Sequence, residues 1–84
     1  MRSFVYKSVR KADTYLYLRD EGAFDAIPVE LMEKLGPPVF VIELLLDASR
    51  PLAREDVEMV MRNLTEQGYH LQLPPAAAEF DRLA

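Results

Sequence analysis

The stretch Thr65–Pro75, "TEQGYHLQLPP", decides how the second half of the chain folds. Gly68 can adopt the left-handed backbone conformation that ends a helix. From Tyr69 to Leu73, apolar and polar residues then alternate, which is typical of a strand with one buried face. The two closing prolines end the strand, because proline has no N–H to donate to a sheet. The stretch predicts a helix, a sharp reversal and a short strand on which His70 and Gln72 lie away from the core.

The residues before this stretch carry the pattern of an amphipathic helix. Four apolar side chains form one stripe at helical spacing: Val57, Val60, Met61 and Leu64. We expect the helix to run from about Arg54 to Gln67. Its start is poorly capped on sequence grounds, because neither Ala53 nor Arg54 has a side-chain oxygen that accepts from the first turn.

The segment Val39–Leu46, "VFVIELLL", is apolar at every position except Glu43. Such a run predicts a central strand covered on at least one side. An unpaired carboxylate is costly to bury, so we expect Glu43 to be exposed or paired with a cation. A functional carboxylate is the alternative. With the helix and the final strand, this segment predicts a βαβ unit with parallel strands and a right-handed crossover.

The N-terminal part of the chain predicts a β-hairpin. Ser3–Val9 and Thr14–Arg19 are rich in β-branched and aromatic residues, and a short polar loop joins them. In the second strand, alternation places the leucines on one face, toward the core, and Tyr15 and Tyr17 on the other. The phenol rings are expected to point toward solvent or a partner, since a phenol can bury its ring and keep its hydroxyl wet. A short helix follows Pro28, which suits the first position of a helix.

These elements give the fold class α+β. We expect a small mixed four-stranded sheet, made of the N-terminal β-hairpin and the βαβ unit, with helices packed mainly on one face. Residues 1–75 form a single domain. Residues 76–84 form a C-terminal tail or a short helix, in which Phe80 and Leu83 dock on the body.

Composition excludes several classes of site. The 84 residues include no cysteine and one histidine, so thiolate chemistry and a cysteine- or histidine-rich metal site are excluded. We expect no cofactor, no metal and no catalytic constellation. The N-terminus lacks the apolar core of a signal peptide, and the longest uncharged apolar run, Pro37–Ile42, is far too short to span a membrane. A cytoplasmic location without membrane attachment follows as the expectation.

Three segments resemble the YcgL domain, a small family found in proteobacteria: Tyr6–Tyr17, Ile27–Pro38 and above all Leu64–Pro75. The resemblance extends from about Phe4 to Pro75. It implies a small α/β domain with no established activity, and it supplies no catalytic residues. An association of the family with gene neighbourhoods that contain ribonuclease D supports an RNA-related alternative.

Charge is uneven along the chain. Residues 1–19 contain five basic side chains and one acidic one, whereas residues 20–84 contain five basic and thirteen acidic ones. Such asymmetry can mark a binding face. The candidate interaction surface is built on the hairpin and the final strand, and its residues are Lys7, Arg10, Lys11, Tyr15, Tyr17, Arg19, Tyr69 and Gln72.

Three functions remain open on this basis. The first is a protein-interaction module that binds a protein partner, or a second copy, through the tyrosine face or an exposed strand edge. The second is an RNA-binding or RNA-metabolism accessory protein, in which basic side chains attract phosphate and tyrosine rings stack on bases. The third is a small ligand-binding or enzymatic domain that uses a groove between the basic hairpin and the Gln67–Gln72 segment, with Tyr69 and Gln72 as polar contacts.

Overall fold

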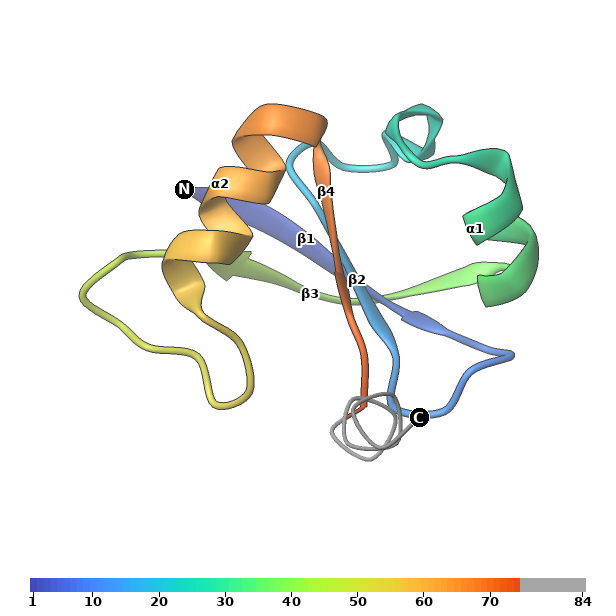
Figure 1. Cartoon of the computed structure of the whole chain (residues 1–84), viewed down its shortest axis with the longest axis horizontal. Coiled ribbons are helices and arrows are strands. Elements are labelled where there is room, and N and C mark those ends of the chain that lie inside the picture. The colour runs from blue at the N-terminus through green and yellow to red at the C-terminus, as the bar shows by residue number, and fades with distance from the viewer. Residues whose placement is uncertain (75–84) are drawn as a thin grey trace, which may run out of the picture.

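The computed structural model describes residues 1–74 and has one four-stranded sheet with helices on both of its faces (Figure 1). The strands are β1 (Arg2–Ser8), β2 (Tyr15–Leu18), β3 (Pro38–Leu45) and β4 (Tyr69–Gln72). Their order across the sheet is β3-β1-β2-β4. The α+β class, the four strands and the N-terminal hairpin are confirmed. The predicted tail at residues 76–84 lies outside the described residues.

Every pair of neighbouring strands is antiparallel. In the hairpin, Val5 lies opposite Tyr17, and on its other side Val5 lies opposite Ile42 of β3. The next pair between β1 and β3 joins Tyr6 to Phe40, so Val41 is one extra residue on β3 and forms a β-bulge. A bulge of this kind typically bends the strand that carries it.

The predicted parallel βαβ unit is wrong. β3 pairs with the outer side of β1, and β4 pairs with the outer side of β2, so the two strands lie at opposite edges of the sheet. The hairpin occupies the centre, and the chain between β3 and β4 has to cross the whole sheet. Both edge strands therefore run antiparallel to their single neighbours, and the sheet is antiparallel rather than mixed.

The helices are η1 (Phe24–Ala26), α1 (Val29–Leu35) and α2 (Val57–Gln67). On one face α2 covers a core cluster of Val5, Tyr17, Leu46, Val57, Val60 and Leu64. On the opposite face, η1 and α1 cover a second cluster of Phe4, Tyr6, Leu16, Leu18 and Ile27. Figure 1 shows α2 and α1 lying apart with the central strands running between them.

The prediction that helices pack mainly on one face is therefore also wrong. Successive strand residues point to opposite faces, and both central strands have apolar side chains at successive positions. Tyr17 packs beneath α2, whereas its neighbour Leu18 packs beneath α1. Each face needs its own cover, and one helix supplies each.

The sequence predicted the C-terminal end of α2 correctly and its N-terminal end incorrectly. The helix begins three residues later than expected and has a good N-cap, since the carboxylate of Asp56 accepts from the backbone N–H groups of Glu58 and Met59 at 3.0 and 3.4 Å. The expected poor cap is wrong because the helix does not start at Arg54. At the other end, Gly68 has φ of 87° and donates its N–H to helix carbonyls, as predicted.

Candidate functional site

The tyrosines of β2 do not form a surface. Tyr17 is only 6% exposed and lies beneath α2, and its hydroxyl donates a hydrogen bond to Gln72 Oε1 at 2.9 Å. Burial, and after it the negative charge of Glu55, raises the pKa of Tyr17 above its ordinary value. Tyr15 is partly buried against the same core cluster. The expectation that these rings point toward solvent or a partner is wrong for Tyr17, because α2 covers the face that they share.

A buried histidine lies beside Tyr17, contrary to the expectation of a side chain away from the core. His70 is 6% exposed, and its ring meets that of Tyr17 edge-on, with centroids 5.7 Å apart. The Asn63 amide nitrogen lies 2.9 Å from Nδ1, and Nε2 lies 3.6 Å from a carboxylate oxygen of Glu55. Among the described residues, Nε2 has no hydrogen-bond partner.

The sequence alone did not indicate that His70 is buried. The alternation in β4 identifies two faces, but it does not say that both are covered. Gln72, on the same face as His70, is also buried, and its side-chain oxygen accepts a hydrogen bond from Tyr17. The contact between Asn63 and His70 joins α2 to the sheet, and the group of Tyr17, His70 and Gln72 lies under the helix rather than in an open groove.

The basic residues of the candidate surface are exposed, but two of them hold helix ends. Arg10 Nη1 donates to the carbonyl oxygen of Glu33 in the last turn of α1 at 2.7 Å. Arg19 donates to the Asp20 carboxylate at 3.2 Å and to the carbonyl oxygen of Thr65 in the last turn of α2 at 3.5 Å. Both arginines therefore satisfy carbonyls that a helix leaves unpaired at its C-terminus.

The eight candidate residues are not brought together as one surface. Lys7 and Lys11 are exposed on the hairpin. Tyr69 is partly buried in the cluster beneath α1, on the face opposite Tyr17 and Gln72. Tyr69 and Gln72 therefore cannot both line one groove. An open hollow of about 470 Å³ does lie between the hairpin loop, at Arg10 and Lys11, and the end of β4, at Leu71 and Leu73.

The most exposed apolar surface belongs to β3, which was predicted to be a central strand and is an edge strand instead. Five large apolar side chains along it are 40–67% exposed: Val39, Phe40, Val41, Ile42 and Leu45. We call these five residues the β3 edge surface. Within residues 1–74, no strand pairs with the outer side of β3. Strands of this kind are templates for pairing with another chain.

The single charged residue of β3 is neutralised within the chain. Glu43 accepts from the guanidinium of Arg2 on the neighbouring strand, and both side chains are exposed. The hydrogen bond to Glu43 raises the pKa of Arg2 above its ordinary value. The expectation that Glu43 is exposed or paired is confirmed, so β3 carries no isolated charge.

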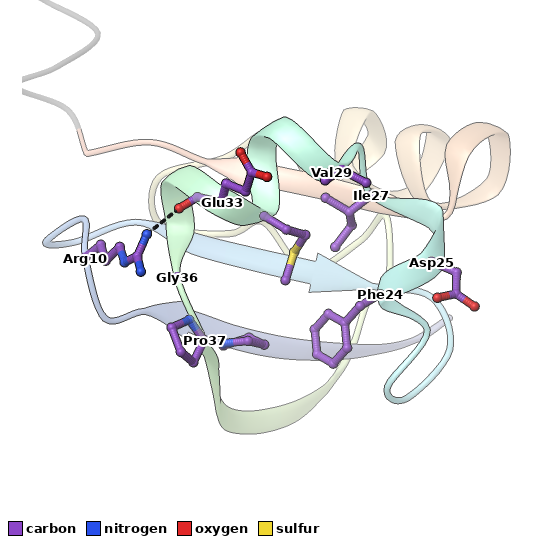
Figure 2. A pocket seen from close by; sticks show the side chains of 10 residues that line it. Arg10, Phe24, Asp25, Ile27, Val29, Glu33, Gly36 and Pro37 are labelled. Carbon is purple, nitrogen blue, oxygen red and sulfur yellow. Dashed lines mark hydrogen bonds between the residues drawn. The ribbon is translucent and has the colours of Figure 1, made fainter.

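An open groove of about 590 Å³ lies between η1, α1 and the start of β3 (Figure 2). Its apolar lining includes Phe24, Ile27 and Met32, and the charged side chains of Arg10, Asp25 and Glu33 also line it. The groove is continuous with the β3 edge surface through three aromatic rings. The Tyr6 ring meets Phe24 at 4.9 Å and Phe40 at 5.5 Å, both edge-on.

The described residues contain neither a candidate metal site nor a helix that could span a membrane. In this part of the chain, no three acidic or histidine side chains converge in a way that could hold a metal ion. Neither α1 nor α2, the two α-helices of residues 1–74, is long and apolar enough to cross a membrane.

Comparison with known proteins identifies the domain. Residues 3–75 match the model of the YcgL domain. A YcgL domain-containing protein of Thioalkalivibrio sulfidiphilus is 48% identical over 75 residues, which cover 89% of this chain and 93% of the relative. One of Pseudomonas aeruginosa is 46% identical, and one of Pseudomonas fluorescens 43% identical, each over 76 residues that cover 90% of this chain and 78% of the relative.

Proposed function

Because the chain belongs to the YcgL domain family, whose relatives are named for a domain and not for a reaction, we propose a function from its exposed surface: it is a protein-interaction module that acts by binding. Its contact region is the β3 edge surface rather than the tyrosine face of β2. A protein partner docks along β3 and buries the apolar side chains that the fold leaves in water.

The exposure of β3 is the observation that carries this proposal. Isolated exposed apolar residues are normal, but five in one strand make a continuous apolar edge of the sheet. Burying apolar surface yields about 25 cal/mol per Å², so the β3 edge surface is a source of binding free energy that the fold itself does not use. The backbone of an edge strand adds unpaired N–H and C=O groups that fix the register of a partner.

The groove beside β3 adds a second element of recognition. A segment that pairs with β3 places every second side chain on the face that holds Phe40, Tyr6 and Phe24. The groove between α1 and β3 is open, apolar at its centre and charged at its margin, which suits an apolar anchor side chain. Backbone pairing then supplies affinity, and the groove supplies selectivity.

Of the two features that supported RNA binding, the basic side chains remain available and the tyrosine rings do not. Lys7 and Lys11 are exposed and could attract phosphate, but the Tyr17 ring is buried and cannot stack on a base. Arg10 and Arg19 are engaged with helix carbonyls. The ligand-binding or enzymatic alternative has the open groove, but no histidine, serine or threonine is among the described residues that line it.

A tagged pull-down separates protein binding from RNA binding. The chain is used as bait at low and at high salt, and the bound material is analysed for protein and for RNA. The double variant Ile42→Lys/Leu45→Lys replaces two exposed side chains of the β3 edge surface, and Met59→Lys, on the exposed side of α2, is the matched control.

We expect protein partners that tolerate moderate salt and are lost only with the β3 variant, because apolar contacts are weakly screened. Circular dichroism verifies that each variant is folded. The proposal would be contradicted if the chain retained RNA, if high salt released this RNA, and if the β3 variant bound as much RNA as wild type.

A further inference from the structure

We propose that the partner of β3 is a second copy of this chain, and that two copies associate by antiparallel pairing of their β3 strands. The inference rests on the proposed function and names its partner. The resulting sheet would have eight strands and would contain no exposed β3 edge.

The two edges of the sheet differ in the way that this proposal requires. β4 has four residues, and His70 and Gln72 on it are buried. β3 has eight residues, and all but Pro38 and Leu44 are exposed. Natural edge strands are usually short, charged or covered, so a long apolar edge indicates a contact that completes the fold.

The exposed side chains of β3 lie on both faces of the sheet. Phe40 and Leu45 lie on the α1 face, where their partners on β1 are Tyr6 and Arg2. Ile42 lies opposite Val5 on the α2 face. A helix or a loop laid on one face would cover only half of the surface. A further strand, in the plane of the sheet, carries side chains to both faces at once.

The occupant therefore has to be a strand that is apolar on both faces and nearly uncharged. The strand Pro38–Leu45, "PVFVIELL", has that composition itself. Its one charge, Glu43, already has a cation in Arg2 of the same copy, so two copies do not bring uncompensated carboxylates together. Antiparallel pairing of a strand with itself is two-fold symmetric and closes at two copies, so it does not extend into a fibre.

Oligomeric state tests the inference directly. Sedimentation equilibrium of the full chain, from about 10 µM to about 1 mM, should show a monomer–dimer equilibrium. The variants Ile42→Lys and Leu45→Lys, one on each face, should each raise the dimer dissociation constant at least about tenfold, and Met59→Lys should not. Added salt should favour the dimer, because each copy carries a net charge of −4.

A cysteine cross-link tests the geometry. The chain has no cysteine, so Val41→Cys and Met59→Cys each carry a single thiol. In a two-fold pairing centred on β3, the two copies of position 41 lie within about one residue of each other, within reach of a short bismaleimide, whereas position 59 on α2 lies outside the interface. With such a cross-linker, the Val41→Cys variant should form a covalent dimer and the Met59→Cys variant should remain monomeric.

The outcomes distinguish this inference from the proposed function. A monomer at every concentration overturns the inference, and the function survives if β3-dependent binding of another protein is still found. A dimer that both lysine variants retain overturns the inference as well, because its interface lies elsewhere. A dimer that is lost in both folded variants and cross-links at position 41 supports it.

Discussion

The side chain of Arg10 lies directly against Gly36. A Cβ atom at position 36 would stand 2.8 Å from Arg10 Cγ and 2.9 Å from its Cδ, closer than real Cβ contacts allow. Gly36 also has φ of 73° and ψ of −170°, a conformation that is essentially restricted to glycine. The hairpin loop is thereby locked to the end of α1, and the guanidinium continues to the carbonyl of Glu33 (Figure 2).

Gly36→Ala should lower the free energy of unfolding by about 2–4 kcal/mol, since it adds backbone strain and overpacking together. Urea unfolding measures this. Gly22→Ala is the matched control, because Gly22 has nearly the same φ, 72°, but nothing lies within 4 Å of its Cβ position. Its cost should be about 1–2 kcal/mol, from strain alone. Equal losses in the two variants would show that neither the contact with Arg10 nor the ψ of Gly36 adds to the strain of a positive φ.

Asp56→Ala should lower the free energy of unfolding by about 1 kcal/mol, because the first turn of α2 loses the carboxylate that accepts from Glu58 and Met59. Thermal and urea unfolding measure the loss. Asp56→Ser keeps an oxygen at the same position and should retain most of the stability. If Asp56→Ala and Asp56→Ser are equally destabilised, the side chain does not act as the cap.

Most local features of the chain were predictable, with the N-cap at Asp56 as the exception, and long-range ones were not. The hairpin and the cap at Gly68 depend on neighbouring residues, so their patterns are complete in the sequence. The place of β3 depends on which strands pair. An apolar run such as Val39–Leu46 has the same pattern in a covered central strand and in an exposed edge strand.

The prediction of the candidate surface was wrong for a related reason. Alternation separates Tyr17 from Leu18, but it does not say which face a helix covers. In this fold two helices from distant segments cover both faces, so Tyr17 and Leu18 are both interior. The apolar surface that remains exposed lies on β3, because the helices of the described residues do not fully cover its side chains.

Because each face of the sheet has its own core, we expect truncation of a buried leucine on either face to lower the free energy of unfolding by a similar amount. Leu18 lies beneath α1 and Leu64 lies in α2, and each is 0% exposed. Leu18→Ala and Leu64→Ala should each lower the free energy of unfolding by about 2–5 kcal/mol, measured by urea unfolding. Met59→Ala, at an exposed position of α2, should change it by less than about 0.5 kcal/mol. A small effect at either leucine would mean that one helix does not hold its face of the sheet.

The burial of Tyr17 predicts a specific loss of stability in alkali. Because burial raises the pKa of Tyr17 in the folded chain, the unfolded chain releases this proton at lower pH than the folded chain does. The contribution of this group to stability is therefore complete below the ordinary tyrosine pKa of 10.0 and declines as the pH rises through that value toward the raised pKa of the folded state.

Urea unfolding of wild type, Tyr17→Phe and the control Tyr15→Phe, from about pH 8 to about pH 11, measures this decline. Tyr17→Phe should be less stable at pH 8, since Gln72 loses its donor, but should lose less further stability in alkali. Tyr15→Phe should follow wild type, because Tyr15 is only partly buried. If wild type and Tyr17→Phe lose equal free energy between these pH values, the Tyr17 hydroxyl is not the group whose ionisation destabilises the fold, and the burial of its ring beneath α2 is contradicted with it.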